Sequence, residues 1–314
     1  MLKKWTKATL FATTAALLLA VGTFTSCSDD DEVYEEIPEF DIMDGILQHY
    51  YGTGGDVTIP DGVRIIGSNA FEAKAITSVV IPSGVVQIQS LAFFNCSELT
   101  SVTLPVSVRE IADDAFWYCD SLKNLTYTGT LKDWCSIQNG ALQSGLTCFV
   151  YGGISIESIK LSDGTDLKTA KTLEIPMGVT AIADYVFYNC WQLESVTIPA
   201  SATFIGDHAF SGCSSLKSVT IPTGLTTISG YAFSNCSSLE SITIPAGVTY
   251  IAPYAFKDCQ SLASVEFNSK DNWSKSFNST SYLTVDVSDP SKNAANLKNT
   301  TYPGWGESGL YKKN

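Results

Sequence analysis

Residues 218–259 read SVTIPTGLTTISGYAFSNCSSLESITIPAGVTYIAPYAFKDC, which is nearly one 23-residue phrase written twice. The phrase recurs along the chain, aligned on an Ile-Pro or Leu-Pro dipeptide. Its prolines are Pro60, Pro82, Pro105, Pro176, Pro199, Pro222 and Pro245. They are 22 or 23 residues apart, except for one interval of 71 residues. A fixed period of about 20–50 residues is typical of a solenoid, in which each unit buries its apolar face only against its neighbours.

Each unit predicts a short strand followed by a corner. The segment Ser241–Ile244 alternates polar and apolar residues, as a strand that is buried on one face does. Pro245 lacks a backbone donor and ends the strand, and Gly247 then suits the last position of a type I turn. Val248 and Ile251 continue the apolar pattern on the return path. The phrase therefore predicts a parallel sheet along one side of a solenoid that is mainly β.

One phenylalanine position repeats in every unit, and Ala precedes it in most of them. Its members are Phe71, Phe93, Phe116, Phe187, Phe210, Phe233 and Phe256. Rungs of a parallel solenoid lie about 4.8 Å apart, a spacing at which large rings contact their counterparts. We expect these rings to form an aromatic spine in the core rather than a cofactor site.

Six of the nine cysteines also share one repeat position. They are Cys96, Cys119, Cys190, Cys213, Cys236 and Cys259. No histidine accompanies them at metal-ligand spacing, and Cβ vectors in such a ladder run parallel, which disfavours disulfides. We expect buried free thiols that pack as small hydrophobes. Cys135 and Cys148 lie in the irregular region and remain the one plausible disulfide pair.

The whole pattern resembles a known repeat class. It is Leu239-x-x-Ile242-x-Ile244-Pro245, then Ile251, then Ala255-Phe256-x-x-Cys259. This is similar to the 23-residue leucine-rich repeat of BspA-like bacterial surface proteins, over about residues 57–267. The resemblance implies a leucine-rich-repeat right-handed superhelix with a parallel sheet on one face. It also implies a non-enzymatic adhesion role. One departure is that Gly247 or Val248 occupies the position where an Asn ladder usually satisfies backbone groups.

The N-terminus predicts export. Three lysines precede the apolar run 8–24, and we interpret residues 1–26 as a secretory signal peptide. Small Ser26 before Cys27 resembles a lipobox, which implies cleavage before Cys27 and lipidation of its thiol. Residues 27–44 are then expected to form an acidic tether. The alternative is an ordinary secreted protein in which Cys27 is incidental.

The charge distribution argues against a nucleic-acid partner. The net charge is −13, but nine of the 32 acidic residues fall within residues 29–44. The remaining bases are scattered rather than clustered, as a nucleic-acid footprint would require. His49 and His208 lack spaced partners, and no phosphate loop, nucleophile elbow or paired-carboxylate motif is present. We predict no catalytic residue, no metal site and no cofactor, and hence no enzyme.

The remaining segments predict two caps and one irregular region. We expect an N-terminal β-hairpin cap at residues 45–57, with the run 46–51 pairing with 57–59. Repeats should occupy residues 58–267, irregular at 126–173. Within this stretch Lys160 aligns with Thr126 and with Glu174, so the sheet should continue while the other side varies. Residues 150–154 suggest an added hairpin.

Residues 268–314 are expected to form a C-terminal strand-helix cap. A strand is predicted at 282–287, and a helix should begin at Pro290 with Asp289 as N-cap and end near Lys298. Four aromatic residues could cover the last rung, namely Trp273, Phe277, Trp305 and Tyr311.

Two surfaces are candidates for binding. The first is the exposed strand face, formed by Glu194, Thr197, Lys217, Thr220, Glu240 and Thr243. Such positions can also be filled simply for β-propensity. The second is the aromatic cluster Tyr185, Tyr188 and Trp191, with Trp117 and Tyr118 at the matching position of an earlier unit. Rings outside the core suggest contact with protein or sugar, although they could pack against the irregular segment.

These features predict an outer-membrane, lipid-anchored module that faces outwards and binds a host or bacterial surface protein. The first alternative is a glycan- or peptide-binding lipoprotein of a nutrient-uptake system. The second is an inert structural spacer.

Overall fold

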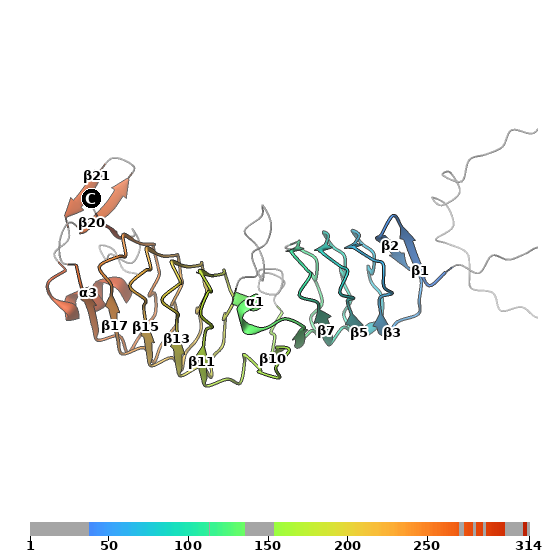
Figure 1. Ribbon diagram of the computed structural model, residues 1–314, viewed down its shortest axis with the longest axis horizontal. Helices are drawn as coiled ribbons and strands as arrows, with labels where there is room; N and C mark the ends of the chain where they lie inside the picture. The colour runs from blue at the N-terminus through green and yellow to red at the C-terminus, as the bar shows by residue number, and fades with distance from the viewer. Residues whose placement is uncertain are drawn as a thin grey trace, which may run out of the picture. The chain divides into compact units, whose positions relative to one another are not determined.

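The computed structural model describes residues 38–112, 114–135, 154–269, 273–278, 281–284, 287–298 and 310–312. Within this part each regular repeat supplies one strand to each of two columns (Figure 1). The first column contains β3 (Gly55–Thr58), β5 (Ile76–Val80), β7 (Ser101–Leu104), β9 (Asn124–Tyr127), β10 (Ser158–Lys160), β11 (Thr172–Glu174), β13 (Ser195–Thr197), β15 (Ser218–Thr220), β17 (Ser241–Ile244) and β19 (Ser264–Phe267). The second contains β4 (Ile65–Ile66), β6 (Gln87–Ile88), β8 (Glu110–Ile111), β12 (Ala181–Ile182), β14 (Phe204–Ile205), β16 (Thr227–Ile228) and β18 (Tyr250–Ile251).

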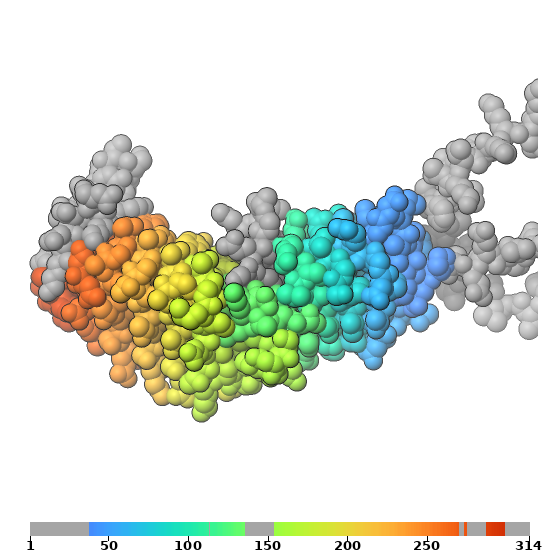
Figure 2. Space-filling view, in the orientation of Figure 1, coloured from blue at the N-terminus to red at the C-terminus, as the bar shows by residue number. Residues whose placement is uncertain are grey.

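The repeat period sets the pairing register in both columns. Val196 pairs with Val219 in parallel β13 and β15, and Ile205 pairs with Ile228 in β14 and β16. On the remaining side of the rung the backbone N–H of Phe210 donates to Ala232 O at 2.8 Å. Neighbouring repeats therefore share hydrogen bonds on several sides, and Figure 2 shows them packed in sequence order within residues 38–314. The predicted parallel solenoid is confirmed.

The predicted aromatic spine is present in two blocks. Phe71, Phe93 and Phe116 stack with centroids 4.9 Å apart. From Phe187 to Phe256 four rings stack at 5.1–5.5 Å, all with no solvent exposure. Offset-stacked aromatic pairs add about 0.5–1.5 kcal/mol each beyond their burial. The spine therefore ties each rung to the next through the core.

The cysteine ladder consists of buried free thiols, as predicted. Each described pairing runs from a thiol to a carbonyl of the preceding rung. Cys119 Sγ lies 3.0 Å from Phe93 O, and Cys259 Sγ lies 3.0 Å from Phe233 O. Burial raises the pKa of the Cys190 thiol to about 11. Cys135 is likewise a free, buried thiol, and Cys148 lies outside the described residues.

The N-terminal hairpin differs from the prediction. It joins β1 (Phe40–Met43) to β2 (Ile46–Tyr50), whereas 46–51 does not pair with 57–59. The turn is Asp44-Gly45, with φ of 53° and 76°, as a two-residue hairpin turn requires. Strand β2 then pairs in parallel with β4 and begins the second column. The expected tether of residues 27–44 therefore extends too far, because residues 40–43 already form a strand.

The irregular region keeps one strand pairing and loses the next. Lys160 pairs with Thr126 in β10 and β9, as the sequence alignment predicts. No ladder joins β10 to β11 among the described residues, so the expected continuous sheet is wrong at this point. Here the chain makes a tight turn in which Leu161 N–H donates to Thr165 O at 2.9 Å. The suggested hairpin at 150–154 lies largely outside the described residues.

Helix α1 (Leu131–Cys135) follows β9 at the same break. Ala183 N–H donates to Cys135 O at 3.0 Å, and the Trp134 indole donates to Val186 O at 2.9 Å. These two bonds attach the helix to the rung that contains β12. Trp134 is fully buried and packs edge-on against Tyr127, with ring centroids 5.1 Å apart. A short helix therefore takes the place that a strand of the second column occupies elsewhere.

The C-terminal cap combines antiparallel strands with a helix. It contains β20 (Trp273–Asn278), β21 (Ser281–Thr284), α3 (Pro290–Lys298) and β22 (Leu310–Lys312). Strand β22 pairs with both β18 and β20, which closes the second column. Trp273 is buried against Phe267 at 4.9 Å, as expected of a capping residue. The side chains of Phe277, Trp305 and Tyr311 lie outside the described part.

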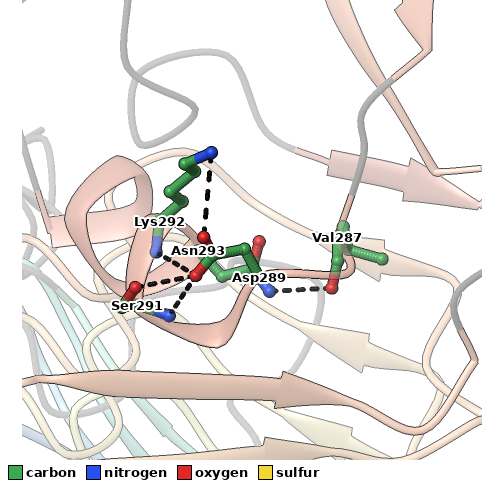
Figure 3. Close-up of polar contacts among 5 residues, drawn as sticks. All are labelled: Val287, Asp289, Ser291, Lys292 and Asn293. Atoms are coloured by element: carbon green, nitrogen blue, oxygen red, sulfur yellow. Dashed lines mark hydrogen bonds and ion pairs between the residues drawn. The ribbon is translucent and has the colours of Figure 1, made fainter.

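The predicted helix start is confirmed. Asp289 Oδ1 accepts hydrogen bonds from Ser291 N–H at 3.1 Å and Lys292 N–H at 3.2 Å (Figure 3). Asn293 is fully buried, and its Nδ2 donates to Val265 O and Val287 O at 3.0 Å each. The cap thus fixes the start of α3, and Asn293 attaches the helix to β19.

Candidate functional site

Four aromatic rings in successive rungs form a stack outside the core, which we call the aromatic column. Tyr185 and His208 lie 4.8 Å apart, His208 and Tyr231 4.6 Å, and Tyr231 and Tyr254 4.9 Å, measured between ring centroids. All four side chains are half-buried. Lys257 Nζ lies 5.6 Å from the centroid of the Tyr254 ring, within cation–π range. The column is a continuous ridge of stacked rings, each of them partly exposed to solvent.

The local backbone explains why these rings project outwards. Each column residue directly precedes the Ala-Phe or Val-Phe pair of its repeat and has a left-handed φ between 54° and 61°. This conformation turns the chain so that the phenylalanine points inwards and the preceding side chain points away. Asp184 Oδ1 accepts the Asp207 N–H at 2.8 Å, and Asp207 Oδ1 accepts the Gly230 N–H at 2.7 Å. These bonds hold adjacent rungs at the spacing that stacks the rings.

His208 is held between two tyrosine rings. The plane of the imidazole is tilted by 11° from the ring plane of Tyr185 and by 4° from that of Tyr231. Burial lowers the pKa of His208, while the charge of Asp207 acts in the opposite direction. The buried Nδ1 atom has no hydrogen-bond partner among the described residues. Both features favour the neutral imidazole, which serves as a flat stacking surface.

The column ends at a pocket of about 440 Å³ in the irregular region, which we call the Lys168 pocket. Its rim is aromatic and contains Tyr185, Tyr188 and Trp191. The Trp191 side chain is 55% exposed. Tyr185 belongs to both features and contacts Tyr188 edge-on at 5.7 Å. The remaining lining is Leu125, Trp134, Ile154, Ser155, Ile156, Glu157, Ile159, Lys168 and Asn189. The volume is in the range of small-molecule sites.

Lys168 is the unusual member of this lining, because it is a charged residue with 5% exposure. Its Nζ donates to the carbonyl oxygen of Tyr188 at 2.6 Å. It makes no ion pair among the described residues. A buried ammonium without a counter-ion carries a large desolvation cost. The pocket therefore presents a positive charge within walls that combine apolar, aromatic and polar side chains.

The strand face predicted from the sequence has its charges paired with one another. Lys217 Nζ lies 2.8 Å and Lys171 Nζ 3.4 Å from the carboxylate of Glu194. The hydrogen bond and charge of Lys217 lower the pKa of Glu194, with a smaller contribution from Lys171. Glu240 adds a further acidic charge near Lys217. The hydroxyl positions on the same face, Thr197, Thr220 and Thr243, are exposed.

The structure thus brings one predicted cluster together and extends it. Tyr185, Tyr188 and Trp191 share the pocket, whereas Trp117 and Tyr118 are exposed on an earlier rung near Phe94. The sequence analysis predicted Tyr185 as a binding residue but did not predict Tyr231 or Tyr254. It gave His208 no role, because His208 lacks spaced partners. It also missed Lys168. The signal for the column was present, because the residue before the Ala-Phe or Val-Phe pair is aromatic or histidine in four consecutive units.

Neither a metal site nor a membrane-spanning helix is found in the described part of the chain. No group of three or more histidine, cysteine or acidic residues is arranged to hold a metal ion there. No helix in that part is long and apolar enough to cross a bilayer.

Comparisons with known proteins identify the repeat. The BspA type leucine-rich repeat region, in six copies, matches residues 51–164 and 180–298. No curated protein matches the chain. The pneumococcal vaccine antigen PcpA is 19% identical, with a TM-score of 0.43 over 72% of this chain and 75% of its own. A leucine-rich repeat protein from Bacteroides ovatus is 21% identical, with a TM-score of 0.41 over 74% and 71%. A Treponema pallidum leucine-rich repeat protein is 24% identical, with a TM-score of 0.33 over 69% and 82%.

Repeats of this type are scaffolds suited to protein binding, are typically not enzymes, and are typically associated with the cell surface. The match spans most of the chain on both sides of the irregular region. The chain belongs to the BspA-type leucine-rich repeat family.

Proposed function

We propose that this protein is a non-enzymatic, lipid-anchored surface module that binds a host or bacterial surface protein through the aromatic column. The observation that carries the proposal is the stack from Tyr185 to Tyr254, four half-buried rings outside the core in consecutive rungs. Aromatic side chains supply large contact area at low entropic cost and are enriched at the centres of protein interfaces. A continuous ridge of stacked rings on a rigid scaffold fits a protein partner.

The strand face is the weaker candidate for the same role. Glu194 already satisfies Lys217 and Lys171, so a partner would have to displace these exposed ion pairs for little gain. The threonines Thr197, Thr220 and Thr243 offer hydroxyl groups on a flat surface. We therefore propose that the partner binds the column, and variants of the strand face serve as controls.

Anchoring rests on the N-terminal sequence. Residues 1–26 would direct export, Cys27 would carry the acyl chains, and the acidic segment that follows would hold the repeats away from an outer membrane. Metabolic labelling with a fatty acid in the native host tests this directly. We expect the label to be lost in Cys27→Ser, with no loss in Cys135→Ser. Equal labelling of Cys27→Ser would refute the anchor.

Two sets of variants test the binding surface. The purified protein is screened against arrays of extracellular-matrix and cell-surface proteins and against glycans. We expect Tyr231→Ser with Tyr254→Ser to weaken protein capture at least tenfold. The triple strand-face variant, in which Thr197, Thr220 and Thr243 become Lys, should bind normally. The reverse pattern would move the site to the strand face, and no capture at all would support an inert spacer.

A second candidate function is glycan or peptide binding within a nutrient-uptake system. The Lys168 pocket favours it, because a volume of about 440 Å³ with Trp191 at its rim suits a small ligand. Capture of glycans or short peptides that is lost in Trp191→Ala, with no protein capture, would support this alternative.

A further inference from the structure

The Lys168 pocket combines a buried lysine with apolar and aromatic lining, and this lysine makes no ion pair among the described residues. Within the part of the chain that the structure describes, Nζ of Lys168 has one acceptor, the Tyr188 carbonyl oxygen at 2.6 Å. An ammonium group has three N–H donors. The charge and the remaining donors therefore call for an acceptor from elsewhere.

Two acidic residues, one close to Lys168 in the sequence and one in the pocket lining, already have other partners. Asp166 accepts hydrogen bonds from Ser158 Oγ at 2.6 Å, from Ile159 N–H at 3.1 Å and from Lys168 N–H at 3.0 Å. Glu157, which lines the pocket, pairs with Lys123 at 2.8 Å. The sequence of residues 136–153 contains no Asp or Glu, so that segment brings no carboxylate to Lys168. Among the described residues, therefore, no carboxylate forms an ion pair with Lys168.

The lining of the pocket indicates which kind of chemical group would be attached to the carboxylate. Leu125, Ile159 and the buried ring of Trp134 form apolar lining, and Tyr188 and Trp191 provide aromatic surface at the rim. A pocket of about 440 Å³ holds one ring-sized group rather than a folded segment. A carboxylate on such a body would form a charge-assisted bond with Lys168 while its apolar part leaves water.

We propose that the Lys168 pocket binds a carboxylate carried on an apolar or aromatic body. Two sources share this chemistry, the C-terminal end of a polypeptide with a bulky apolar last residue and a free small acid. The inference builds on the proposed binding function and names the chemical group that the pocket end of the aromatic column recognises.

The first test needs no substitution. Calorimetry on the full-length protein compares an acetylated hexapeptide ending in phenylalanine with the same peptide amidated at its C-terminus. We expect the free acid to bind at least tenfold more tightly, because only its carboxylate can accept from the Lys168 ammonium. A third titration uses 3-phenylpropionate. Binding as tight as that of the peptide identifies a free small acid, and weaker binding identifies a chain terminus.

A matched pair of variants locates the effect. Lys168→Met should abolish the preference for the acid over the amide. Lys160→Met removes an exposed charge from β10, outside the pocket, and should preserve the preference. Lys168→Arg keeps the positive charge and should retain part of the preference for the acid. This variant keeps the test decisive if Lys168→Met fails to fold.

Three results would overturn the inference. They are equal binding of acid and amide, no binding of any of the three probes, and a preference that survives Lys168→Met in a folded protein. Binding of glucuronic acid without binding of the apolar acids would equally overturn it, since the pocket would then recognise an acidic sugar. If protein capture by the aromatic column persists in these cases, only the carboxylate site is refuted and the proposed function stands.

Discussion

The imidazole of His208 lies 4.6 Å from the ring of Tyr231, with the two planes 4° apart. The relationship repeats one rung earlier with Tyr185 at 4.8 Å. Neither contact belongs to the phenylalanine spine inside the core. The spacing between rungs therefore stacks aromatic rings twice, in the phenylalanine spine inside the repeat and in the aromatic column outside it.

Protonation of His208 should destabilise the protein. Burial lowers its pKa below the 6.5 of an exposed histidine, so the unfolded chain takes up the proton first as the pH falls. The contribution of His208 to stability is complete above about pH 6.5 and declines as the pH falls below that value. Urea unfolding at pH 7.5 and at pH 5 should show a smaller difference in His208→Phe than in the unaltered protein. NMR titration should place the pKa of His208 below 6.5. A pKa above 6.5 would contradict the prediction.

The phenylalanine spine should dominate stability. Phe210→Ala removes a fully buried ring that stacks at both faces and should lower the free energy of unfolding by about 3–5 kcal/mol. Phe204→Ala is the matched control, because Phe204 lies on β14 and its side chain is 37% exposed. Chemical denaturation monitored by circular dichroism measures both. Equal losses in the two variants would contradict the prediction, because the buried, stacked ring would then stabilise the protein no more than an exposed one.

The ladder thiols should be protected in the native state. Burial raises the pKa of Cys190 to about 11, so the reactive thiolate is scarce at neutral pH. We expect the six ladder cysteines to resist alkylation in buffer and to react fully in denaturant. Mass spectrometry of the labelled peptides counts them. A denatured count well below six, without reductant, would mean that disulfides form along the ladder.

The N-cap of α3 should be worth more than the ion pair beside it. Asp289→Ala leaves the amides of Ser291 and Lys292 without their acceptor and should cost about 1 kcal/mol. Lys292→Ala removes an exposed ion pair of 3.7 Å and should change stability by about 0.3 kcal/mol or less. Thermal unfolding distinguishes the two. Similar effects would indicate that the side-chain charge, not the cap, stabilises this helix end.

Much of the fold could be predicted because a repeat places every residue in the same environment. The periodic Ile, Phe and Cys positions predicted the core, and the alignment of Lys160 with Thr126 predicted a pairing across the expanded unit. The N-terminal hairpin was misplaced because the acidic composition of residues 29–44 is typical of a tether, although residues 40–43 form a strand that pairs with β2. A strand that occurs once carries no periodic signal, and its partner must be found by geometry.

The sequence by itself determined the solenoid, its register, the phenylalanine spine and the cap at Asp289. Only the tertiary structure decided that Tyr185, His208, Tyr231 and Tyr254 touch, and that Lys168 is buried beside Tyr188. Repetition fixes what each rung presents to its neighbour, because the same contact recurs every 23 residues. The pocket arises where repetition fails, and there the position of a side chain depends on distant segments that no local pattern specifies.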